Sequence, residues 1–165
     1  MMSKREKFVK LANAEVIANS LYIWGGQGES VQDTTPAVIQ KMESSNENAS
    51  RVLKTLANKI NAGCNMKKAK YFDCSGLVVY LLTLLKIIDA DYTAQGIYRE
   101  LCVPVLRTDL KAGDLCFINS GSKITHVGIY GGDNTVIEAA GRDIGVVSRG
   151  INKNKWNLYG RVKGL

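Results

Sequence analysis

The first half of the chain has hydrophobic residues at the spacing of amphipathic helices. Between residues 4 and 20 these positions recur at roughly helical spacing, which predicts a first helix: Phe8, Leu11, Ala12, Val16 and Ile17. The glycine-rich stretch LYIWGGQGES follows, and we expect it to end that helix in a turn.

Residues 33–62 again show a helical pattern. Thr35 followed by Pro36 suits a helix start, because proline is tolerated at the first helical position. The polar stretch SSNENAS interrupts the pattern, and ASRVLKTLANKINAG predicts a second helix that Gly63 closes. Further on, Asp73 is a candidate N-cap for a helix over about 74–85.

The pattern changes after Pro104. DLCFIN, THVGIYGG, TVIEAAG and GVVSRG are short runs rich in valine and isoleucine and separated by turn residues, which predicts an antiparallel sheet. The residues GGDN between two of these runs suit a hairpin turn. Because helices come first and strands second, the sequence predicts an α+β fold with N-terminal helices packed on a C-terminal antiparallel β-sheet.

Composition adds few constraints. The 165 residues, 45% hydrophobic and 22% charged, fit a single domain over 1–165. No apolar stretch is long enough for a membrane span, so we expect none. The N-terminal segment is charged and then amphipathic and lacks the apolar core of a signal peptide, so we expect synthesis in the cytoplasm without a signal peptide.

The net charge of +7 makes anionic partners plausible. The charge is spread along the chain, however, with no RNA-recognition signature, so we expect no nucleic acid partner. One histidine and four scattered cysteines lack the close pairs of a zinc site, so we expect no metal and no cofactor. Cys102 and Cys116 stand in apolar runs and read as buried small hydrophobes.

Cys74, in the stretch YFDCSGLVVYLL, is the first candidate for chemistry. A cysteine in the first turn of a helix faces unpaired backbone N–H groups and the positive end of the helix dipole. Both favour the thiolate, which is the nucleophilic form. The same N–H groups could hold the oxyanion of a tetrahedral intermediate. The alternative is a buried thiol at the start of a core helix.

The chain has a single histidine, His126, at the start of the predicted strand THVGIYGG. A cysteine nucleophile needs an imidazole that takes its proton and later protonates the leaving amine. Only His126 can do this, although a lone strand histidine is more often structural. On the next predicted strand, Glu138 interrupts an apolar run. It is either an outward-facing residue or the group that orients the imidazole.

Five stretches occur in the order and character of the NlpC/P60 cell-wall peptidase family, which the chain resembles: LYIWGG, FDCSGLVVYLL, DLKAGDLCFI, ITHVGIYGGDNTVIEA and WNLYGRV. The resemblance implies a papain-like core with Cys74 as nucleophile and His126 as general base. It also implies that Tyr22 donates a hydrogen bond near the oxyanion, Asp73 braces the helix start and Ser75 lines the substrate groove. Tyr22 could otherwise be a core aromatic residue.

The chain departs from the family pattern in two places. Many members have histidine as the third polar residue of the site, where this chain has Glu138, and a carboxylate there is closer to the related CHAP amidases and peptidases. The segment at about 27–70 is a helical insertion where the family usually has a short loop. Its excess of basic residues could shape the groove or hold the anionic wall, or it could be a neutral surface insertion.

The resemblance implies a cysteine endopeptidase that hydrolyses peptidoglycan stem peptides at the γ-D-glutamyl-diamino acid bond, in a phage lysin or tail-associated role. The alternatives are an N-acetylmuramoyl-L-alanine amidase and an inactive wall-binding module. The expected partners are bacterial peptidoglycan, anionic wall polymers, and a wall-binding domain or phage tail protein. The enzyme would act on the cell wall after release or as part of a virion.

Overall fold

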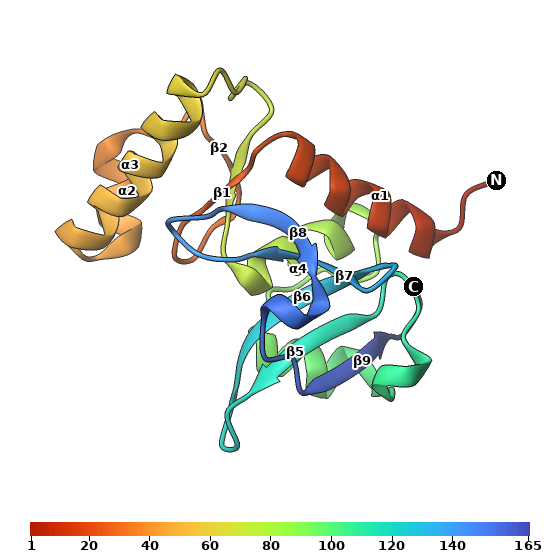
Figure 1. Cartoon of the computed structure of the whole chain (residues 1–165). Coiled ribbons are helices and arrows are strands. Elements are labelled where there is room, and N and C mark those ends of the chain that lie inside the picture. The colour runs from red at the N-terminus through yellow and green to blue at the C-terminus, as the bar shows by residue number, and fades with distance from the viewer.

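The computed structural model describes residues 1–165, and a six-stranded antiparallel sheet forms its C-terminal half (Figure 1). The strand order is β4-β9-β5-β6-β7-β8. The strands are β4 (Cys102–Pro104), β5 (Leu115–Asn119), β6 (Ile124–Gly132), β7 (Thr135–Ala139), β8 (Val146–Gly150) and β9 (Leu158–Val162). The predicted hairpin joins β6 to β7, with Asp133 and Asn134 both at positive φ, as a tight hairpin turn requires.

Helices α1 (Lys4–Ile17) and α4 (Cys74–Leu84) pack beside each other against this sheet. Helix α4 is apolar around most of its circumference because it lies in the centre of a twenty-residue hydrophobic core. A short α5 (Ala94–Gly96) and the helical turns Ile97–Leu101, Arg107–Asp109 and Ile151–Lys153 connect the remaining elements. The predicted α+β arrangement of helices on a C-terminal sheet is therefore confirmed.

Side-chain caps account for where the helices start. Ser3 accepts a hydrogen bond from the Glu6 amide and forms a capping box at α1. Thr35 caps α2 (Pro36–Glu43), with Pro36 at its first position as predicted. The first helix ends at Ile17, three residues before the predicted limit, because the chain turns into the left-handed region at Asn19.

A second, three-stranded sheet was not predicted. Its strands β1 (Leu21–Tyr22), β2 (Gln27–Ser30) and β3 (Lys70–Phe72) run in the order β1-β3-β2. The stretch expected to be only a turn therefore contains two strands around its glycines. Strands of two to four residues are too short to show an alternating pattern in the sequence. The insertion leaves the sheet after β2 and returns in β3, where Ser30 pairs with Lys70.

Strands β4 and β9 were also absent from the sequence prediction. Pro104 lies in β4, which is an edge strand of the large sheet, and an edge is where a strand tolerates proline. In β9, Gly160 and Arg161 interrupt the apolar run that would have indicated a strand.

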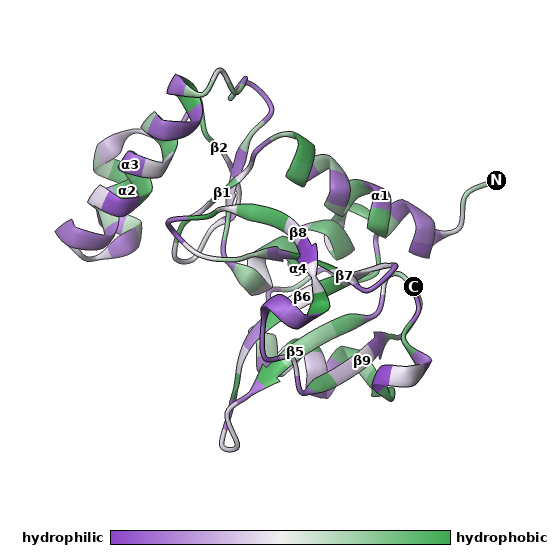
Figure 2. Ribbon diagram, in the orientation of Figure 1, coloured by the Kyte–Doolittle hydropathy of each residue, from purple (hydrophilic) through white to green (hydrophobic).

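The insertion folds into two adjacent helices, α2 and α3 (Asn46–Asn61). They lie at one end of the molecule, away from the large sheet (Figure 1). Figure 2 shows polar residues over much of this pair, whereas the central helix and strands are mainly hydrophobic. The two helices share a separate nine-residue core with the small sheet, which includes Ile39, Val52 and Tyr71. No helix in the structure combines the length and apolar character needed to cross a lipid bilayer.

Candidate active site

Cys74 is the first residue of α4, and Asp73 before it is the N-cap, as predicted. Asp73 Oδ1 accepts a hydrogen bond from the Gly76 amide at 2.6 Å, and its Oδ2 accepts one from the Gly25 amide at 3.1 Å. The Ser75 hydroxyl lies 3.3 Å from the same Oδ1. Asp73 therefore fixes the helix start that carries the sulfur and ties it to the glycine-rich loop after β1.

The glycines of this loop and of α4 permit an unusually close approach. The Asp73 amide donates to the Gly26 carbonyl at 2.9 Å. A Cβ atom placed on Gly76 would lie 1.9 Å from that same carbonyl oxygen, so no larger residue fits without movement. The backbone contact presses the loop against the first turn of α4 and so determines where Trp24, exposed on that loop, lies relative to Cys74.

His126 lies on β6 and faces a carboxylate on the neighbouring strand. Its Nε2 is 3.0 Å from Glu138 Oε1, so its Nδ1 is the ring nitrogen left for the thiol. Burial alone lowers the pKa of His126, but hydrogen bonding and charge interaction with Cys74 and Glu138 outweigh burial and raise the pKa to about 9. At neutral pH the imidazole is therefore mainly protonated and stands next to the sulfur.

Glu138 is almost completely buried, so it is not an outward-facing strand residue. Its Oε1 accepts a hydrogen bond from Asn154 Nδ2 at 3.2 Å and lies 3.2 Å from Arg149 Nη2. Burial raises the pKa of this carboxyl, but His126, Arg149 and Asn154 together hold the pKa below its usual range. Glu138 is thus ionised, and sequence reasoning identified neither Arg149 nor Asn154 as its partners.

Trp156 was also missed as a site residue. Its ring lies parallel to that of His126, with centroids 5.2 Å apart and an interplanar angle of 15°. Gly128, two residues after the histidine, leaves room for it, because a Cβ atom there would lie 2.9 Å from the indole. The tryptophan stands in the quoted motif WNLYGRV, but nothing in a linear motif reveals which ring it will cover.

Tyr22, at the end of β1, has Cys74, Asp73, Arg142 and Glu43 as ionisable neighbours. Burial, together with the nearby ionisable groups of Cys74 and Asp73, raises the pKa of Tyr22 to about 12, and the Arg142 cation opposes only part of that shift. The phenol therefore keeps its proton at neutral pH and can donate a hydrogen bond. The Arg142 guanidinium carbon lies 5.5 Å from the centre of the tyrosine ring.

A groove of about 450 Å³ joins these residues, a volume within the usual range of ligand sites. The nucleophile candidate, the histidine and the three other family-implied residues all line it, while Glu138 lies behind the histidine. The lining is Tyr22, Trp24, Asp73, Cys74, Ser75, Thr93, Ala94, Lys123, Ile124, Thr125 and His126. All six residues singled out from the sequence therefore belong to one site.

The other cysteines lie apart from this groove. Cys102 and Cys116 are buried, and burial raises the pKa of each thiol to about 12. Both are the small buried hydrophobes that the sequence predicted.

The fold and the site together define a papain-like α+β domain with a cysteine and a histidine in one groove and a carboxylate behind the histidine. The chain belongs to the NlpC/P60 family, whose profile matches residues 19–161. Murein DD-endopeptidase MepH of Escherichia coli (strain K12) is 36% identical over 93 residues, which are 53% of this chain and 34% of that protein. The probable endopeptidase p60 of Listeria grayi is 34% identical over 88 residues, 53% of this chain and 16% of that protein.

The chain thus spans about a third or less of the length of these two curated relatives. Among solved structures, RipD of Mycobacterium tuberculosis aligns over 100% of both chains with a TM-score of 0.64 and 16% identity. That protein is described as a non-catalytic NlpC/p60 domain protein adapted to peptidoglycan binding. The structural alignment with RipD therefore shows that the similarity in fold covers the whole chain.

Proposed function

We propose that this chain is a cysteine peptidase that hydrolyses the stem peptides of bacterial peptidoglycan. The observation that carries the proposal is the chain of contacts from Cys74 through His126 to the buried Glu138, with Cys74 and His126 lining one groove. Family membership and two relatives named as endopeptidases support it. A binding role alone would not require this chain of contacts.

The geometry suits acyl transfer in two stages. The Cys74 sulfur attacks the carbonyl carbon of the scissile amide, and the protonated His126 gives its proton to the leaving amine. Backbone N–H groups at the start of α4 and the Tyr22 phenol are placed to stabilise the oxyanion. The imidazole of His126, now neutral, then takes a proton from a water molecule whose oxygen attacks the thioester carbonyl. The Cys74 thiolate leaves, and both side chains are back in their starting states. Glu138 holds the ring and stabilises its charged form throughout.

For the scissile bond we propose the link between D-glutamate, joined through its side chain, and the diamino acid. The MepH relative is named as a DD-endopeptidase, so a bond between two D-centres is a second candidate. An N-acetylmuramoyl-L-alanine amidase would use the same catalytic residues. A phage lysin or tail-associated setting, with anionic wall polymers as further partners of this positively charged chain, is part of the same proposal.

Mass spectrometry of muropeptides released from walls of known chemotype separates these bonds. We expect products that carry a new N-terminal diamino acid. Stem peptides with a free N-terminal L-alanine would instead identify an amidase, and loss of cross-linked dimers alone would identify a DD-endopeptidase. Cys74→Ala is the control for contaminating hydrolases, because it removes the nucleophile and leaves the groove intact.

The same pair of proteins tests the non-catalytic alternative that RipD illustrates. If Cys74→Ala binds walls as well as the unsubstituted protein does but releases no muropeptide, the chemistry belongs to this cysteine. If neither protein releases any product from walls of several chemotypes, the peptidase proposal is wrong and a wall-binding role takes its place.

A further inference from the structure

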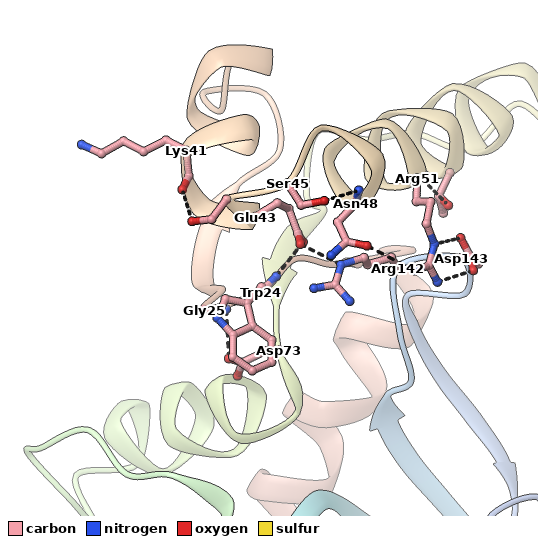
Figure 3. Close-up of polar contacts among 12 residues, drawn as sticks. Trp24, Gly25, Lys41, Glu43, Ser45, Asn48, Arg51, Asp73, Arg142 and Asp143 are labelled. Atoms are coloured by element: carbon pink, nitrogen blue, oxygen red, sulfur yellow. Dashed lines mark hydrogen bonds and ion pairs between the residues drawn. The ribbon is translucent and has the colours of Figure 1, made fainter.

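The helical insertion contacts the active-site groove through one buried carboxylate, Glu43. This residue ends α2, and its side chain is fully buried. Glu43 Oε1 accepts a hydrogen bond from the Trp24 amide at 2.9 Å, and its Oε2 accepts one from Arg142 Nε at 2.7 Å (Figure 3). One carboxylate thus joins the loop that carries Trp24 to the loop between β7 and β8.

This arrangement uses only one nitrogen of the Arg142 guanidinium. No other group of the chain accepts a hydrogen bond from Arg142, so its two terminal nitrogens have four N–H bonds free. Figure 3 shows these nitrogens pointing away from Glu43, on the side where Trp24 and Asp73 lie. The side chain is partly exposed and packs over the Tyr22 ring, so the free donors are next to the groove wall.

A guanidinium fork with both terminal nitrogens free can donate two parallel hydrogen bonds to the two oxygens of a carboxylate. Burying Glu43 behind it fixes the orientation of the fork, so that little side-chain freedom is lost on binding. The neighbouring Asp143, unlike Glu43, does not fix the orientation of the fork. It forms its own exposed ion pair with Arg51, at 2.6 Å, and its side chain makes no hydrogen bond or ion pair with that of Arg142.

We propose that Arg142, held by Glu43 of the insertion, binds a substrate carboxylate at the Tyr22 side of the groove and sets substrate specificity. The inference rests on the proposed function. A glutamyl residue that is linked through its side chain keeps its α-carboxyl group free, and in amidated walls that group is a neutral carboxamide. Arg142 therefore selects the carboxylate form over the amidated form of the stem peptide.

Two tripeptides test this directly: L-Ala-γ-D-Glu-L-Lys and its counterpart with a carboxamide on the glutamyl α-carbon. Loss of a hydrogen-bonded charge pair in a groove changes affinity by about 10- to 100-fold. We expect kcat/KM for the carboxylate peptide to exceed that for the amide by about this factor. Arg142→Gln should bring the ratio close to one, and Arg142→Lys should restore only part of it because lysine lacks the fork.

Glu43→Gln should lower the ratio less than Arg142→Gln does, since the fork remains but is no longer fixed. Asp143→Asn is the matched control, and we expect it to keep the original ratio because the Arg51 pair lies outside this contact. Equal turnover of the two peptides by the unsubstituted protein, or an equal loss on both in Arg142→Gln, would overturn the proposal. Thermal unfolding of each variant shows whether a loss comes from misfolding.

Calorimetric titration of both peptides into Cys74→Ala separates this inference from the proposed reaction. Tighter binding of the carboxylate peptide, lost in Cys74→Ala/Arg142→Gln, supports the Arg142 site even if the unsubstituted protein cleaves neither peptide. Binding without preference, or no binding of either peptide, contradicts the inference.

Discussion

The imidazole of His126 lies parallel to the indole of Trp156, with ring centroids 5.2 Å apart. The tryptophan covers one face of the ring, while the ring edges contact Cys74 and Glu138. The stack therefore restricts rotation of the imidazole out of the plane in which it meets both partners. Since Trp156 itself is buried, it also keeps water from the His126–Glu138 hydrogen bond.

Replacing Trp156 with Leu removes the stack but keeps an apolar cover. Stacked aromatic pairs contribute about 0.5–1.5 kcal/mol, so we expect kcat to fall by about 2- to 10-fold. Trp156→Phe keeps an aromatic face and should lose less. Steady-state kinetics with thermal unfolding as a folding control checks this, and equal rates in all three proteins would contradict a role for the ring.

Replacing Glu138 with Gln keeps a hydrogen-bond acceptor for His126 but removes the negative charge. Because the protonated imidazole loses its counter-charge, we expect kcat to fall by about 10- to 100-fold without vanishing. Glu138→Ala, which also removes the acceptor, should be slower still. Kinetics unchanged in Glu138→Gln would show that the charge has no part in the reaction.

The pKa of His126 can be measured directly, since the chain has one histidine and therefore one set of imidazole NMR signals. We expect a titration midpoint near pH 9. The folded protein then binds this proton more tightly than the unfolded chain, whose imidazole titrates near 6.5. The resulting stabilisation is fully present below about pH 6.5 and is lost as the pH rises through about 9.

The same titration predicts that activity falls above about pH 9, where the imidazolium that protonates the leaving amine disappears. In Cys74→Ala and in Glu138→Gln the NMR midpoint should move down, because each change removes one of the groups that raise it. A midpoint near 6.5 in the unsubstituted protein would contradict the coupling between these residues.

Thiol alkylation should be selective. We expect iodoacetamide to modify Cys74 and abolish activity, while Cys102 and Cys116 stay unmodified in the folded protein because burial holds their thiols protonated. Peptide mapping by mass spectrometry locates the label. Cys64 is half-buried, so Cys64→Ser serves as the background in which inactivation follows Cys74 alone. Full labelling of Cys74 with activity retained would contradict its role.

Gly76 tests the contact between the glycine-rich loop and α4. A Cβ atom there would overlap the Gly26 carbonyl, so Gly76→Ala should destabilise the protein by about 1–3 kcal/mol, as overpacked sites do. Gly150→Ala is the control, because no atom lies within 4 Å of a Cβ at that position. Chemical denaturation measures the stability of both variants. An unchanged midpoint in Gly76→Ala would show that the loop around Gly26 moves to make room for the added methyl group.

Local signals account for what the sequence predicted correctly. Asp73 before an apolar helix, Pro36 after a threonine and the GGDN turn are each determined by residues within a few positions. Glu138 was ambiguous, because a carboxylate in an apolar strand can face either side. Only the pairing of β6 with β7 places it next to His126.

The contacts that sequence reasoning missed all join distant segments. Glu43 and Arg142 are 99 residues apart, and neither stands in a recognisable pattern. Arg149 belongs to a strand whose pairing with β7 brings it near the carboxylate of Glu138. Such partners become visible only when the fold sets the registers, so charged residues in the loops looked like ordinary surface positions.

The return of the insertion at Lys70, opposite its exit at Ser30, has a consequence for how this domain can vary. Because the two ends are paired on neighbouring strands, the intervening chain forms a loop closed by the small sheet. The entropic cost of closing such a loop grows only slowly with its length. Cys74, two residues after the end of β3, would keep its position through such changes. Groove selectivity could then diversify through changes confined to this one segment.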